Sequence, residues 1–204
     1  MNDEIKPDET LIEKTIIALR ANNIEAELVK TKEQALNRLK ELIPAGAEIM
    51  TGSSMTLNQI GFTDLLVSGN HPWKNLKDEI VNEKDPKKQT LLRKQSVLAE
   101  YFLGSVQAVT ENGETLIASA SGSQLPAYAF TSPNVIWVVS VKKIVPDLET
   151  GLKRINDHVF PLEDARMKSA GASGSVIGRI LIFKKEIMTD RKVRLIFVNE
   201  NLGF

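Results

Sequence analysis

One segment restricts the fold of this chain more than any other. Residues Asn134–Val141 read NVIWVVSV, an almost unbroken apolar run. A run of this kind is typical of a strand covered on both faces, as in the parallel sheet of an α/β protein. Shorter β-type segments at 25–29, 47–51, 179–183 and 193–199 alternate with helical patterns. We therefore predict an α/β fold: a Rossmann-like, open, mostly parallel sheet with helices on both faces.

The helical patterns lie at about 7–23, 31–43, 54–66, 87–102 and 146–159. Thr31 and Gln34 have the spacing of a capping box, and Pro146 suits the first turn of the last helix. We interpret 1–9 as a flexible lead and 10–204 as a single domain. The polar segment 68–88 and the glycine-containing segment 167–178 are expected to be connections, and either one is a candidate lid.

An antiparallel hairpin is predicted where Val106–Ser119 places Asn112-Gly113 between two alternating apolar runs. Asn-Gly favours a type I′ turn, because both central residues of that turn need a positive φ. A loop of small and hydroxyl-bearing residues, 119–123, follows directly. The hairpin is expected to be an insertion into the mostly parallel sheet.

Composition excludes several functions. Lys and Arg number 26, as do Asp and Glu, so there is no basic excess for nucleic-acid binding. The chain has no cysteine and only two histidines, so neither a thiolate nor a multi-histidine metal site is expected. No apolar run approaches a membrane span, and the acidic, polar N-terminus is unlike a signal peptide. We therefore expect a cytoplasmic protein without a membrane anchor.

Two loops are candidate sites for an anionic ligand. The turn at 52–56 precedes a predicted helix, whose first N–H groups and nearby hydroxyls would face an anion. The loop at 119–123 offers a second group of donors. The alternative explanations are an ordinary helix cap for the first loop and a tightly packed turn for the second. The predicted ligand-binding residues of these loops are Gly52, Ser53, Ser54, Thr56, Ser119, Ser121, Gly122 and Ser123.

Two charged residues complete the candidate site. Lys143 follows the buried strand, at the strand end where open α/β sheets bind ligands, and could pair with a phosphate or carboxylate. Glu100 precedes Tyr101 at the expected junction of helix and strand. A carboxylate partly buried there would have a raised pKa and could act as a general base, so Glu100 is the candidate catalytic residue. The alternatives are a solvated lysine and an exposed helix end.

The order of these motifs resembles the LUD domain family of bacterial lactate-utilisation proteins, over about residues 10–200. The segments that carry the resemblance are GSSMTLNQIG at 52–61, AEYFLGSVQAVTENG at 99–113, SGS at 121–123, KIVPDL at 143–148 and RI at 154–155. The family is similar in fold to the superfamily of ribose-phosphate isomerase, glucosamine-phosphate deaminase, CoA transferases and the folate cyclo-ligase. The resemblance implies a cleft at the strand ends that holds phosphates or other anionic groups.

The chain departs from its relatives in two places. Some relatives carry a cysteine-rich segment near the C-terminus, where this chain has the loop 171–178 without cysteine. Relatives also often have Asp or Glu in the loop after the hairpin, whereas this chain has Ser119-Ala120-Ser121-Gly122. Any metal role of the first segment and any acid–base role of the second are therefore not expected here.

The resemblance implies a function in lactate and organic-acid utilisation, with a small anionic or phosphorylated metabolite as ligand. It names no cofactor and leaves open whether the protein is an enzyme. A non-catalytic subunit that supports a redox partner protein is the first alternative, and an exposed apolar face around Trp73, Leu76 and Ile80 would favour it. A metabolite-sensing module is the second. A homo-oligomer is compatible with each of these functions.

Overall fold

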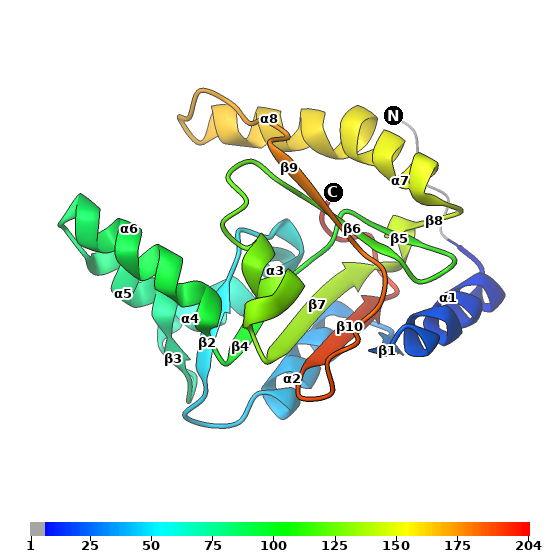
Figure 1. The fold of residues 1–204 in the computed structure, drawn as a ribbon, viewed down its shortest axis with the longest axis horizontal. Coiled ribbons are helices and arrows are strands. Elements are labelled where there is room, and N and C mark those ends of the chain that lie inside the picture. The colour runs from blue at the N-terminus through cyan, green and yellow to red at the C-terminus, as the bar shows by residue number, and fades with distance from the viewer. Residues whose placement is uncertain (1–6) are drawn as a thin grey trace.

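The computed structural model describes residues 7–204, and its centre is a six-stranded parallel sheet, here called sheet A (Figure 1). Its strand order is β1-β10-β7-β4-β2-β3, and every neighbouring pair is parallel. The fold class predicted from the sequence is thereby confirmed. The strands of sheet A are β1 (Ile24–Val29), β2 (Glu48–Thr51), β3 (Lys74–Asn75), β4 (Tyr101–Gly104), β7 (Asn134–Ser140) and β10 (Lys192–Val198).

The apolar run of β7 fills the middle of sheet A, and all of its residues after Asn134 are buried. Val135, Trp137 and Val139 point to one face, whereas Ile136 and Val138 point to the other. This is the alternation of a strand, and both faces are apolar because both are covered. Helices α2 (Lys32–Leu42), α3 (Met55–Gln59) and α4 (Phe62–Ser68) cover one face. Helix α1 (Glu9–Ala21) and a second sheet cover the other.

The predicted hairpin belongs to that second sheet, sheet B, rather than to the parallel sheet. Sheet B has the strand order β8-β5-β6-β9, and only β8 and β5 pair in parallel. The turn also differs from the type I′ prediction. Gly113 has φ +81°, but Asn112 is not in the left-handed region, and Gly113 donates to the carbonyl of Thr110 at 2.9 Å. The strands are β5 (Ala108–Thr110), β6 (Thr115–Ser119), β8 (Ile144–Val145) and β9 (Arg179–Phe183).

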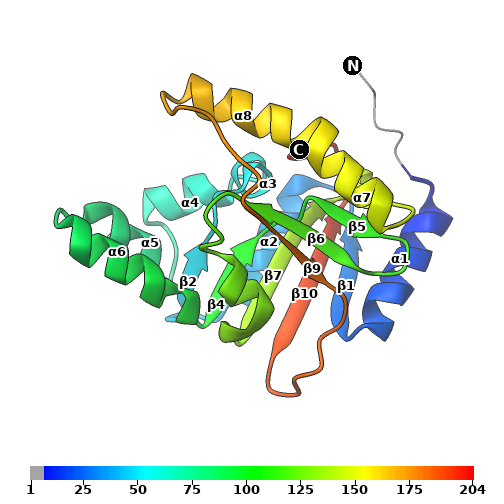
Figure 2. The same ribbon diagram turned by 45° about the horizontal axis from the view of Figure 1, so that its top comes forward.

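A long helical arm lies across the outer face of sheet B (Figure 2). Helix α7 (Leu148–Arg154) continues through a π-helical turn, Ile155–Val159, into α8 (Phe160–Ser169). The helix begins two residues after Pro146, because Asp147 accepts a hydrogen bond from Thr150 N and acts as its N-cap. Pro161 explains the π-helical turn, since proline has no N–H to continue the α-helical pattern.

The segment between β2 and β4 is more ordered than its sequence indicates. Residues 68–88 contain β3, helix α5 (Leu76–Asn82) and the start of α6 (Pro86–Gln95). The helix expected over 87–102 was therefore wrong at its C-terminal end. Tyr101–Gly104 is strand β4, and the apolar side chains of Leu91 and Leu98 are 54% and 65% exposed. A strand forms there because β4 pairs on both sides, with β2 and β7.

The N-terminal lead predicted over 1–9 falls mostly outside the described residues. Within them, Asp8 accepts a hydrogen bond from Leu11 N and caps α1, which begins at Glu9. In residues 7–204, no helix is both long and apolar enough to cross a membrane.

Candidate functional site

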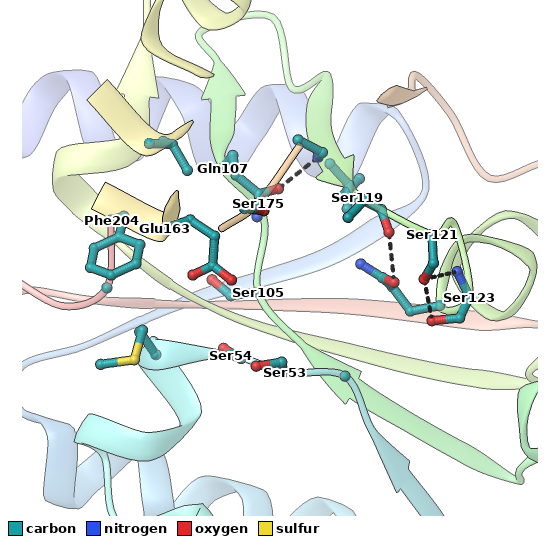
Figure 3. Close-up of a pocket in the computed structure, with 18 of the residues that line it drawn as sticks. Ser53, Ser54, Ser105, Gln107, Ser119, Ser121, Ser123, Glu163, Ser175 and Phe204 are labelled. Carbon is teal, nitrogen blue, oxygen red and sulfur yellow. Dashed lines mark hydrogen bonds between the residues drawn. The ribbon is translucent and has the colours of Figure 1, made fainter. Parts of the chain in front are cut away.

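A cavity of about 420 Å³ lies at the carboxyl ends of β2, β4 and β7, below the α7–α8 arm. This is the edge of an open parallel sheet at which ligands bind in α/β proteins. The volume is in the range of small-molecule sites. Both loops predicted from the sequence contribute to its wall (Figure 3).

The loop after β2 forms the floor of the cavity. Ser53 and Ser54 both line it, but Ser54 Oγ also accepts from Leu57 N at 3.2 Å, as an ordinary N-cap does. The helix that it caps, α3, has only five residues, so its dipole contributes little. Thr56 is buried and donates from Oγ1 to Ser105 Oγ at 3.3 Å. Side-chain hydroxyls, rather than a long helix, therefore give this wall its polarity.

Lys143 lies in the same wall and is only 3% exposed. It follows β7 in a short 3-10 turn, Val141–Lys143. Its ammonium group donates to Thr56 Oγ1 and Ser105 Oγ, each at 3.3 Å, and to the Val106 carbonyl at 3.1 Å. Two of these acceptors are hydroxyl oxygens, one on α3 and one just after β4, and the third is a backbone carbonyl oxygen. The structure thus brings two of the predicted site residues, Lys143 and Thr56, into contact.

The loop at 119–123 lies on another side of the cavity, although its donors are used differently from the prediction. Ser119 Oγ accepts from Gly122 N at 2.9 Å and donates to Gln124 Oε1 at 3.0 Å. Ser121 donates to Ser123 Oγ at 3.1 Å (Figure 3). Of the predicted residues, Gly122 is not in the cavity wall, and its N–H already has a partner within the loop. This loop therefore offers hydroxyl groups, not a cluster of backbone N–H groups.

Helix α8 supplies a carboxylate and a guanidinium group. Glu163 and Arg166 line the cavity and pair through two hydrogen bonds, Arg166 Nε to Oε2 at 2.7 Å and Nη2 to Oε1 at 2.6 Å. The hydrogen bond to Glu163 raises the pKa of Arg166. Figure 3 shows Glu163 reaching into the cavity on the side opposite Ser54. No feature of the sequence indicated that Glu163 would lie here.

Two further basic side chains come from α5, in the segment that was expected to be a connection, and from α6, in the predicted helix that follows it. Lys77 of α5 donates to Thr51 Oγ1 at 3.4 Å, and Arg93 of α6 also lines the cavity. Burial lowers the pKa of Lys77, against the smaller opposing effect of Asp78. In the part of the wall formed by residues 7–204, the basic side chains are therefore Lys77, Arg93, Lys143 and Arg166, whereas Glu163 is the acidic one.

Glu100 lies elsewhere. It is exposed, precedes β4 at the amino end of the strand, and is not part of the cavity wall. Its backbone carbonyl accepts from Asn134 N at 3.1 Å, which joins β4 to β7. The structure therefore does not bring the candidate catalytic residue to the two loops.

Several site residues had only weak signals in the sequence, and others had none. Ser105 and Gln107 lie just after β4, in the segment 99–113 that carries the family resemblance. Tyr128, Lys77 and Arg93 come from segments whose position depends on packing. Residues Ser175–Ile177 of the glycine-containing loop form part of the wall, and Ser175 N donates to Asp164 Oδ1 at 2.8 Å.

Among residues 7–204, no three His, Asp or Glu side chains are grouped so that they could hold a metal ion.

Comparisons with known proteins agree with the fold and the motifs. A crystal structure of a DUF162 family protein from Deinococcus radiodurans matches with a TM-score of 0.55 and 10% sequence identity, covering 95% of this chain and 100% of that one. At this identity the likeness shows the fold alone. No curated protein matches the chain. A sequence model of the LUD domain matches residues 12–190, nearly the whole chain, which confirms the resemblance noted in the sequence. The chain therefore belongs to the LUD domain family.

Proposed function

We propose that this LUD-domain protein acts in organic-acid utilisation by binding a small organic anion, a carboxylate or a phosphate ester, in the cavity at the strand ends. The single observation that carries the proposal is Lys143, a buried ammonium group in a hydroxyl-rich cavity wall. Hydrogen bonds to Thr56 and Ser105 orient its Nζ, and an anion in the cavity could take the place of one of these acceptors and also accept from the neighbouring hydroxyls.

The charge balance of the wall supports the same conclusion. Glu163 is paired with Arg166, and Lys77, Arg93 and Lys143 bring further basic side chains to the described wall. A partly enclosed cavity screens these charges less than bulk water does, which favours a ligand of negative charge. Serine and threonine hydroxyls can supply further hydrogen bonds to its oxygens.

No specific observation favours the redox-partner alternative. The apolar face that would support it is not exposed, since Trp73 is 7% and Ile80 is 4% exposed. Trp73 also donates from Nε1 to the Ile43 carbonyl at 3.1 Å, which ties it to the body of the domain.

Calorimetric titration tests the proposal with two- to five-carbon carboxylates, orthophosphate and glycerol phosphate, each compared with a neutral amide or alcohol of similar size. At least one anion should bind, and Lys143→Met should weaken its binding about ten- to hundredfold, the worth of a hydrogen bond to a charged group. Lys143→Arg should retain part of the affinity. Lys153→Met, on the exposed side of α7, is the control and should bind as the wild type does. Binding that is equal in Lys143→Met and wild type would refute the proposal.

A further inference from the structure

The cavity wall contains a hydroxyl group that the fold does not use. Tyr128 is only 2% exposed, yet it lines the cavity. Within residues 7–204, no group forms a hydrogen bond with its hydroxyl, and burial is the cause of the raised pKa of this phenol. Buried tyrosine hydroxyls usually have a partner, because an unsatisfied polar group destabilises the folded state. The Oη atom is not sealed inside the protein, since Tyr128 borders the cavity, so a partner for it can come from a bound ligand or from water.

The surrounding residues hold this hydroxyl in one place. The ring of Tyr128 packs edge-on against Phe102 at 5.3 Å and against Trp137 at 5.6 Å between ring centroids. Its Oη lies against the backbone of two strand ends. A Cβ atom added at Gly104 would be 1.8 Å from Oη, and one added at Gly52 would be 3.7 Å from it. Gly104 does not have a positive φ, so the hydroxyl itself accounts for the glycine.

A fixed phenol at this position is suited to donating one hydrogen bond. A tyrosine is already protonated at neutral pH, and burial raises the pKa of Tyr128 further, so it carries no charge that would repel an anion. The hydroxyl lies in the same cavity wall as Lys143. The two groups offer different chemistry: a cation for the charged end of a ligand and a neutral donor for another oxygen.

We propose that Tyr128 is a specificity-determining residue, whose hydroxyl donates a hydrogen bond to an uncharged oxygen of the bound anion. The cavity then selects small anions that carry a hydroxyl or carbonyl group in addition to their charged group. This inference rests on the proposed function, because it takes the anion at Lys143 as given. A site with a fixed hydrogen-bonding group discriminates against analogues that lack the partner atom.

The test compares butanoate with butanoates that carry a hydroxyl or an oxo group at each carbon in turn, so that no spacing is assumed. Wild type should bind at least one oxygenated probe more tightly than butanoate. Tyr128→Phe should weaken that probe about two- to twelvefold, the worth of one neutral hydrogen bond, and leave butanoate unchanged. Tyr101→Phe is the matched control, since Tyr101 is the other tyrosine of the chain and does not line the cavity.

Two further readouts separate a ligand contact from a structural role. Tyr128→Phe should not lower the midpoint of urea unfolding, because it removes a hydroxyl without a protein partner. With tyrosine labelled at Cζ with ¹³C, the protein should show two resonances, and the oxygenated probe should shift the one that Tyr128→Phe removes. A lower unfolding midpoint in Tyr128→Phe, or an unshifted resonance at saturating probe, would overturn the assignment.

The outcomes distinguish this inference from the proposed function. If no anion binds, or if Lys143→Met binds as wild type does, the proposed function fails and this inference fails with it. If binding depends on Lys143 but the preference for an oxygenated probe is absent or persists in Tyr128→Phe, this inference alone fails.

Discussion

Gly104→Ala should destabilise the protein because of a single atom, the hydroxyl oxygen of Tyr128. The new Cβ would be 1.8 Å from Oη, far inside any van der Waals contact, and the next atom, Cζ, would be 3.0 Å away. Tyr128 cannot simply move aside, because its ring is buried against Phe102 and Trp137. Overpacking of this kind typically costs about 1–3 kcal/mol of unfolding free energy. For a domain of this size, each kcal/mol lowers Tm by about 2–4 °C.

Tyr128→Phe removes the atom that causes the overlap. The nearest remaining ring atom then needs a shift of only a few tenths of an ångström, and alanine is better than glycine in a strand by about 0.5–1 kcal/mol. We therefore expect the cost of Gly104→Ala to fall by about 1–2 kcal/mol in the Tyr128→Phe background, a coupling typical of residues in contact.

Urea unfolding of the wild type, both single variants and the double variant, followed by tryptophan fluorescence, measures this coupling. Gly151→Ala is the matched control. Its Cβ would also be close to a neighbour, Leu116 Cδ2 at 3.0 Å, but not to Tyr128. Its cost should be the same in both backgrounds. An equal cost of Gly104→Ala with and without the hydroxyl would refute the explanation of this glycine, and with it the fixed position of Oη.

Two further predictions concern charged groups. Arg191 and Glu186 form a buried ion pair at 2.5 Å, and Arg191 also donates to three backbone carbonyls. Arg191→Met should therefore lower the free energy of unfolding, measured in urea, by about 3–5 kcal/mol. We attribute this loss to the buried carboxylate of Glu186, which is left without its cation. Adding Glu186→Gln should therefore recover part of the stability, and a double variant no more stable than Arg191→Met would contradict this cause. Burial lowers the pKa of Lys77 in the folded protein below 10.5, its ordinary value. Between that lowered pKa and pH 10.5, the unfolded chain binds more protons at this lysine than the folded protein does. The contribution of Lys77 to the free energy of unfolding therefore rises with pH in this window. Lys77→Met should therefore gain more stability at pH 7 than at pH 10, and a gain independent of pH would contradict this.

The fold class and most strands could be predicted because their signals are local. The apolar run of β7 indicated a strand with two covered faces, and β7 is indeed the middle of sheet A. The predicted C-terminal end of the 87–102 helix was wrong. Leu91 and Leu98 have the spacing of an apolar helix face, but both side chains face solvent, so this spacing did not mark a buried helix. Tyr101–Gly104 became a strand through its pairing with β2 and β7, which no short window of sequence contains.

The site was predictable only in part, for a similar reason. Loops after β2 and β7 reach the same edge of a parallel sheet in any such fold, so Thr56 and Lys143 could be expected near one another. Lys77 and Glu163 come from helices whose positions depend on packing over long distances in the chain. Their surroundings in sequence are those of ordinary exposed helices.

The sequence by itself determined the local elements: an apolar run for β7, the N-cap of α2 at Thr31, and a hairpin with glycine at the turn. These follow from side-chain periodicity and backbone preference, which act over a few residues. Only the tertiary structure decided the strand order, the layering of sheet B on sheet A, and the meeting of Tyr128 with Gly104. Those depend on which apolar surfaces bury one another, and burial joins residues that are far apart along the chain.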